Sequence, residues 1–166
     1  MRILGIDPGF ERLGIAVLEP ALRREGQKKN YNHRVVFSEC FKTSAKLNFA
    51  ERLNLIGQEV RKIIKKYKPE VLAIETLFLN TNQKTAMRVA EARGVVIYEA
   101  VQAELRIFEA TPLQIKIAVT GYGRADKEQV KKMIQMLVEV DKSKNSDDEL
   151  DAVAIALTAF AHAKSL

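Results

Sequence analysis

The order of the apolar segments constrains the fold of this chain most strongly. Three short apolar runs come first, and after them apolar runs alternate with segments of helical spacing. This order predicts an α/β fold, with a five-stranded mixed sheet and helices on both faces. The expected strands are residues 2–7, 13–18, 33–42, 71–75 and 106–110, and the expected helices are residues 49–67, 83–103, 112–119, 127–138 and 148–163.

Two of the expected strands end in an acidic residue. Right-handed crossovers are nearly universal in such sheets, so strand 71–75 is expected beside strand 2–7. A crevice then opens past their carboxyl ends, where Asp7 and Glu75 lie. Asp7, which precedes Pro8 and Gly9, also suits a turn. Glu75 follows the apolar run VLAI, where a buried charge needs a cation, a hydrogen bond or a metal.

A third group of acids begins the last expected helix, in the segment NSDDELDAVAIAL. Ser146 can cap this helix, and acids in a first turn complement the helix dipole, so each acid alone is explained by helix-end chemistry. Asp148 and Asp151 are three residues apart and therefore share a helix face. The apolar stripe that contains Ala154 is expected to turn Asp151 toward the sheet.

These acids predict a metal site. Several inward carboxylates cannot all stay ionised together without cations. Ligands that are all oxygen select Mg²⁺ or Mn²⁺, and two such ions about 4 Å apart can activate a water and stabilise the leaving oxygen of a phosphodiester. We therefore expect Asp7, Glu75, Asp148 and Asp151 to bind two Mg²⁺ ions, for which Mn²⁺ can substitute. No Cys/His set suggests zinc, and no P-loop pattern suggests nucleotide hydrolysis.

Composition narrows the class of protein. The 166 residues suit a single domain over residues 1–166, and the net charge of +6 favours a polyanionic partner. No apolar run approaches the roughly 18 residues that span a bilayer, and the first residues lack the apolar core of a signal peptide, so we expect a cytoplasmic protein. Cys40 is the only cysteine and is expected to be an ordinary sheet residue.

Five motifs occur in the order in which one nuclease family carries them. They are GIDPG at 5–9, AIE at 73–75, EARGV at 91–95, GxGxAxKxQV at 121–130 and DxxDAxAI at 148–155. Together they resemble the RuvC family of Holliday-junction resolvases, which has the ribonuclease H-like fold, and the resemblance spans nearly the whole chain. GIDPG is shared with several relatives of that fold, whereas the last two motifs are much more specific.

The resemblance assigns roles to individual residues. It implies that the same four acids bind metal and catalyse cleavage, and that Asp147 and Glu149 are helix-start acids. It also implies that Lys116 and Lys127 lie along the path of the DNA phosphates, although a solvated helix charge would explain either lysine. Phe78 matches an aromatic residue that meets bases at the junction crossover, and core packing is its alternative.

The function implied is that of a structure-selective endodeoxyribonuclease in DNA recombination and repair. A homodimer would resolve four-way junctions by paired, symmetric, metal-dependent hydrolysis that leaves 5′-phosphate nicks. A branch-migration helicase complex is left open as a further partner. The basic loop at residues 20–32 is longer than is usual for the family, and it is either an additional DNA contact or a solvated loop.

Three other classes of protein share features with this sequence. A RuvX/YqgF-type nuclease shares the GIDPG-like start but is smaller and lacks the GxGxAxKxQV segment. A non-catalytic junction-binding module would be expected to lose one or more of the four acids, and all four are present. The sugar-kinase and chaperone ATPase fold needs a second, similar domain, for which 166 residues leave no room. The catalytic resolvase is therefore preferred.

Overall fold

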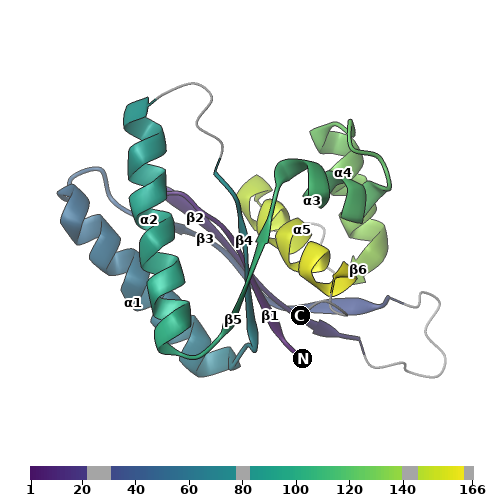
Figure 1. Cartoon of the computed structure of the whole chain (residues 1–166), viewed down its shortest axis with the longest axis horizontal. Coiled ribbons are helices and arrows are strands. Elements are labelled where there is room, and N and C mark those ends of the chain that lie inside the picture. The colour runs from purple at the N-terminus through teal and green to yellow at the C-terminus, as the bar shows by residue number, and fades with distance from the viewer. Residues whose placement is uncertain (22–30, 78–82, 140–145, 163–166) are drawn as a thin grey trace.

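The computed structural model describes residues 1–21, 31–77, 83–139 and 146–162, and its helices lie on both sides of one sheet (Figure 1). The strands are β1 (Ile3–Asp7), β2 (Arg12–Pro20), β3 (His33–Lys42), β4 (Val71–Glu75), β5 (Arg106–Ala110) and β6 (Val138–Glu139). The helices are α1 (Phe49–Tyr67), α2 (Gln83–Gln102), α3 (Pro112–Thr120), α4 (Lys127–Leu137) and α5 (Asp147–Ala161).

The sheet is mixed, with the strand order β5-β4-β1-β2-β3-β6. β1 pairs antiparallel with β2 and parallel with β4, and β5 continues the parallel half. The predicted position of strand 71–75 beside strand 2–7 is confirmed. The predicted fold class is confirmed, but the sheet has six strands rather than five. β6 is two residues long and directly follows α4, so it has no periodicity of its own that a sequence pattern could reveal.

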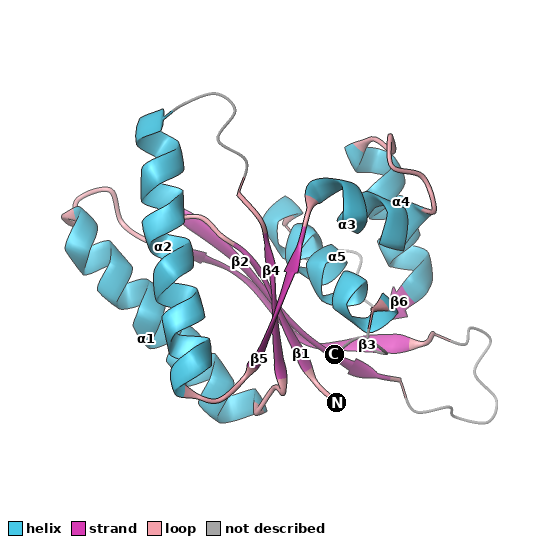
Figure 2. Ribbon diagram, viewed as in Figure 1, coloured by secondary structure: helices cyan, strands magenta, loops and turns pink. Residues whose placement is uncertain are grey.

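The helices cover both faces of the sheet (Figure 2). A hydrophobic cluster fills the space between the sheet and the helices on each face. Successive side chains of a strand point to opposite faces. Ile3 of β1 accordingly belongs to the cluster under α3, α4 and α5, while Leu4 and Ile6 belong to the cluster under α1 and α2. The same alternation holds in β4, where Val71 and Ala73 face α5.

Helix α5 lies unusually close to β1 and β2 because glycines face it. A Cβ atom on Gly5 would lie 2.2 Å from the carbonyl oxygen of Ala152, and one on Gly14 would lie 2.2 Å from that of Asp148. Only glycine leaves room for a helix backbone at this distance. The first turn of α5 is therefore held directly against the sheet.

Four helices begin with a capping box, in which a side chain at the N-cap and one three residues later satisfy each other's backbone amides. The pair at α5 is Ser146 and Glu149, which supports the prediction that Glu149 is a helix-start acid. The other pairs are Asn48 with Glu51, Thr111 with Gln114, and Asp126 with Gln129. In the part of the chain that the structure describes, none of the helices is long and apolar enough to cross a membrane.

Candidate active site

Asp7 and Glu75 lie at the ends of neighbouring parallel strands and on the same face of the sheet. Asp7 is two and four residues beyond Gly5 and Ile3, which both face α5, and Glu75 is two residues beyond Ala73. The Glu75 strand end is also tied down, because Arg93 Nε donates a hydrogen bond of 3.0 Å to the Glu75 carbonyl oxygen. Both carboxylates therefore project toward the helix that carries the third group of acids.

The close approach of α5 brings its first turn to these strand ends. The hypothetical Cβ on Gly14 that meets the Asp148 backbone would also lie 3.1 Å from the Asp7 Cβ. Gly14 pairs with Asp7 across β1 and β2. A helix start, a strand end and a neighbouring strand thus meet at one point.

A cavity of about 270 Å³ opens at this point. Asp7, Glu75 and Asp151 line it together with Lys116 and Lys127. Its other lining residues are apolar: Pro112, Ile115, Val130, Ala154 and Ile155. Five of the seven predicted site residues therefore share one cavity.

The other predicted site residues lie elsewhere. Asp148 does not line the cavity, and Phe78 lies outside the described residues. The basic residues of the predicted loop also lie outside them: Arg23, Arg24, Lys28 and Lys29.

The carboxylates of this cavity repel one another. The pKa of Asp7 is raised from 3.8 to about 7, chiefly by burial and also by the charges of Asp151, Glu75 and Asp148. Burial also raises the pKa of Glu75, with a contribution from the charge of Asp151. The pKa of Asp151 is raised by burial too, against the opposing effect of Lys127. Perturbed acids that share a cleft are typical of functional sites.

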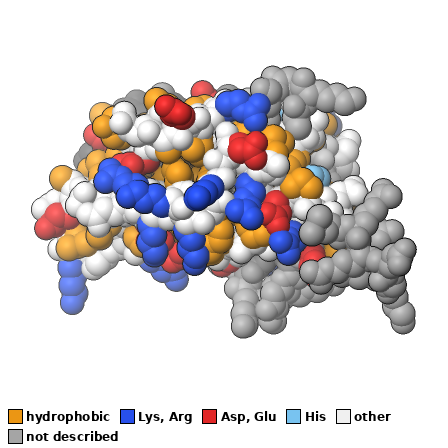
Figure 3. Space-filling view, turned by 90° about the horizontal axis from the view of Figure 1, so that it is seen from below, with side chains coloured by type: hydrophobic (Ala, Val, Ile, Leu, Met, Phe, Trp, Pro, Cys, Tyr) orange, Lys and Arg blue, Asp and Glu red, His pale blue; other side chains and the backbone are white. Residues whose placement is uncertain are grey.

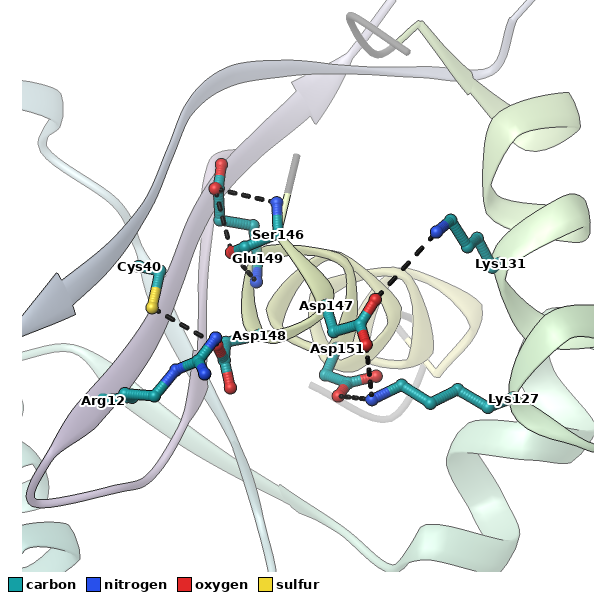
Figure 4. A network of polar contacts seen from close by, with 9 residues as sticks. All are labelled: Arg12, Cys40, Lys127, Lys131, Ser146, Asp147, Asp148, Glu149 and Asp151. Carbon is teal, nitrogen blue, oxygen red and sulfur yellow. Dashed lines mark hydrogen bonds and ion pairs between the residues drawn. The ribbon is translucent and has the colours of Figure 1, made fainter. Parts of the chain in front are cut away.

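Basic residues of α4 approach the acids of α5 from one side (Figure 4). Lys127 Nζ lies 3.5 Å from Asp151 Oδ2 and 3.4 Å from Asp147 Oδ2. Lys131 Nζ lies 4.0 Å from Asp147 Oδ1. Asp147 is thus an exposed acid paired with α4 and does not line the cavity, in keeping with its prediction as a helix-start residue.

Asp148 turns to the opposite side of the helix start (Figure 4). Its Oδ2 accepts a hydrogen bond from the Arg12 guanidinium and one of 3.2 Å from the Cys40 thiol. Sequence reasoning missed both partners. Arg12 is an exposed residue at the start of β2 with no motif around it, and Cys40 was expected to be an ordinary sheet residue.

The donor set suits a hard divalent cation, although its ligands are not yet assembled. Among the residues that the structure describes, no three His, Cys, Asp or Glu side chains form a ready-made metal site. The acids that line the cavity nevertheless offer only oxygen ligands, and their mutual repulsion is what a bound cation relieves. Asp148 and Asp151 are instead held by Arg12 and Lys127.

Comparisons with known proteins identify the family. A sequence profile described as "Crossover junction endodeoxyribonuclease RuvC" matches residues 3–159. The chain belongs to the RuvC family. It is 43% identical over 157 residues to the RuvC of Thermosipho melanesiensis, with 94% of each chain covered, and 43% identical over 157 residues to that of Halothermothrix orenii, with 95% of this chain and 90% of the relative covered.

Structural comparison agrees with this assignment. The fold matches T. thermophilus RuvC in complex with a Holliday junction substrate with a TM-score of 0.87 and 31% identity, covering 99% of this chain and 96% of the other. The predicted RuvC resemblance and ribonuclease H-like fold are confirmed. Membership in RuvC also confirms the predicted class of activity, an endodeoxyribonuclease that resolves Holliday junctions in DNA recombination and repair. RuvC nucleases are in general metal-dependent.

Proposed function

We propose that the chain hydrolyses phosphodiester bonds of four-way DNA junctions at the cavity lined by Asp7, Glu75 and Asp151, with Asp148 as the fourth acid. The observation that carries this proposal is that three carboxylates from three separate elements meet two lysines in one cavity. Its substrate is supported by the family and by the Holliday junction bound to T. thermophilus RuvC. Retention of all four acids argues against a non-catalytic junction-binding module.

The four acids would hold two Mg²⁺ ions, with Mn²⁺ as a substitute. When bound, such ions supply an activated water and stabilise the leaving oxygen. The chain's own contribution is to hold carboxylates close together in a partly apolar cavity, where Ile115, Val130 and Ile155 limit their solvation. This makes the carboxylate set a strong ligand for cations.

Lys116 and Lys127 would bind the phosphate backbone of the substrate. Both line the cavity, so a phosphate presented to the acids would lie within reach of both ammonium groups. Basic side chains outside the cavity are compared with them on one face of the molecule. On the face seen from below in Figure 3, basic side chains are interspersed with acidic and hydrophobic ones. The cavity lysines, rather than the net charge, therefore indicate where DNA binds.

We further propose that the chain acts as a homodimer through α2. This helix exposes Met87, Tyr98 and Val101, which are 65%, 59% and 54% exposed, together with Gly94. These positions are separated by seven, four and three residues and so share one helix face. Burying this stripe against a second copy would remove exposed apolar surface and give two active sites related by a two-fold axis.

Other predictions remain proposals. They are a single nuclease domain over residues 1–166, a cytoplasmic location, base contact by Phe78 and a branch-migration helicase complex as partner.

Mapping the cuts in a four-way junction tests this function. Each strand is labelled in turn, and the cuts are located at nucleotide resolution in Mg²⁺ and in EDTA. We expect Mg²⁺-dependent nicks at equivalent positions on two opposing strands, 5′ phosphates that ligase can seal, and the mass of a dimer in solution. Scattered cuts would contradict symmetric resolution, and equal cutting of linear duplex would contradict junction selectivity.

A further inference from the structure

The carboxylate of Asp148 occupies a polar niche that the cavity does not include. Arg12 begins β2 and Cys40 lies in β3, opposite Gly14. Since Gly14 has no side chain, the backbone of Asp148 rests on the sheet at this position. The carboxylate then lies between the Arg12 guanidinium and the Cys40 thiol, and both donate to the same oxygen, Oδ2 (Figure 4).

The two acids of α5 that are predicted to bind metal therefore differ in what holds them. Asp151 lines the cavity and approaches Lys127 at 3.5 Å, a distance typical of a loose ion pair. Asp148 instead makes a charge-assisted hydrogen bond to a guanidinium, which is a more directional interaction than one to an ammonium group. The side chain of Asp148 is 23% exposed and that of Arg12 is 53% exposed.

We propose that Arg12 is an internal counter-ion of Asp148, which a divalent cation must displace before Asp148 can become a ligand of the cavity. This inference rests on the proposed metal-dependent function. The Asp148 backbone and the Asp7 Cβ both lie against Gly14, so the two acids start from neighbouring points, and the charge of Asp148 raises the pKa of Asp7. Arg12 neutralises Asp148 when no cation is bound and thereby competes with the cation for the same oxygen.

The Arg12 side chain has room to move away from the Asp148 carboxylate. This side chain is half exposed, and Arg12 is the first residue of β2, where solvent can replace the carboxylate. Cys40 presents a weaker obstacle, because a thiol is a neutral and weak donor. Arg12 is therefore the contact that sets the strength of the competition.

Direct measurement of Mn²⁺ binding tests the proposal without DNA and without cleavage. The electron paramagnetic resonance signal of free aqueous Mn²⁺ is followed during titration of the whole protein, the Arg12→Gln variant, the Asp148→Asn variant and the double variant. Arg12→Gln is expected to tighten Mn²⁺ binding about five-fold, the scale of one partly exposed ion pair. In the Asp148→Asn background the same substitution is expected to change Mn²⁺ affinity by less than about two-fold.

Arg124→Gln is the matched control for loss of one positive charge. Arg124 is exposed, precedes α4, and belongs to no ion pair that the structure gives within its described residues. It should leave Mn²⁺ affinity nearly unchanged. Thermal melting of each variant checks that the fold is retained.

The outcomes separate the inference from the function on which it rests. Tighter binding in Arg12→Gln that disappears when Asp148 is absent supports the counter-ion role. An equal gain in both backgrounds, or weaker or unchanged binding in Arg12→Gln, would overturn it while leaving the metal site intact. Wild-type protein that binds no Mn²⁺ would overturn the proposed metal site and the inference together.

Discussion

On the face of the sheet covered by α1 and α2, the buried carboxylate of Glu99 is fully paired, whereas on the face covered by α5 several carboxylates crowd around one cavity. Glu99 is 7% exposed, and it accepts hydrogen bonds of 2.9 and 2.7 Å from Arg61 Nε and Nη2. Burial instead raises the pKa values of Asp7, Glu75 and Asp151, and the charge of Asp151 raises those of Asp7 and Glu75 further. A buried carboxylate is therefore paired with an arginine on one face, whereas on the other face buried carboxylates are crowded together.

The two faces also differ in how closely the helices approach. Large aliphatic side chains such as Leu4, Ile6 and Ile56 separate α1 and α2 from the sheet. Gly5 and Gly14 let the backbone of α5 rest on the strands themselves. The close approach is what carries acids of a helix to acids at the ends of strands, so packing on this face determines the chemistry.

Neutralising an acid of the crowded face should have the largest effect. Asp7→Asn is expected to reduce junction cleavage at least about 100-fold while junction binding persists, because a cation ligand is lost and repulsion is relieved. Single-turnover cleavage and gel-shift binding measure the two effects. Asp147→Asn is the matched control, since Asp147 does not line the cavity, and it should retain most activity. Wild-type rates for Asp7→Asn would remove Asp7 from the site.

Adding a methyl group on each face, in separate variants, should test how closely the helices approach the sheet. Gly5→Ala is expected to destabilise the protein by about 2–3 kcal/mol, because its Cβ would meet a helix carbonyl oxygen that cannot move aside. Gly57→Ala in α1 would meet side chains rather than backbone, namely Val95 at 3.2 Å and the Glu99 carboxylate at 3.4 Å. Its stability change should stay within about 1 kcal/mol, because the helix propensity of alanine offsets the crowding. Urea denaturation compares them, and equal losses would contradict the close-approach argument.

The pH dependence of stability should reveal how strongly the ionised form of Asp7 is disfavoured in the folded protein. The folded-state pKa of Asp7 is raised above its unfolded value, so the folded state binds the extra proton between about pH 4 and pH 7. Stability contributed by this proton is therefore lost as the pH rises through that window. In EDTA, the thermal midpoint of the wild type should fall with rising pH relative to that of Asp7→Asn, and Mg²⁺ should restore it at pH 8. Parallel pH profiles for the two proteins would show that Asp7 is not strained by its neighbours.

The smallest effect on stability and cleavage is expected for a substitution on the face covered by α1 and α2. Glu99→Gln should destabilise the protein by about 1 kcal/mol, because it removes the charge of a mostly buried partner of Arg61. It should leave the rate of junction cleavage unchanged, since Glu99 lies across the sheet from the cavity. Denaturant unfolding together with a cleavage assay gives both values. A Glu99→Gln variant more stable than the wild type would contradict the contrast between the two faces.

Local patterns in the sequence determined much of the fold and part of the site. Short apolar runs and helical spacing of 3.6 predicted the five longer strands and the five helices that the structure describes, because both patterns are properties of contiguous residues. The rule of right-handed crossovers then placed β4 beside β1, and with it Glu75 beside Asp7. Sequence motifs were sufficient to predict the RuvC family, which the comparisons confirm.

Only the tertiary structure decided which charges meet. Arg12 and Cys40 are 136 and 108 residues from Asp148, and no local periodicity relates residues so far apart. Their meeting depends on the register between β2 and β3, which sets Cys40 opposite Gly14, and on the contact of Gly14 with α5. The sequence predicts four equivalent acids, because nothing local distinguishes Asp148 from the other three. In the folded protein three of them line the cavity, and Arg12 holds Asp148 outside it.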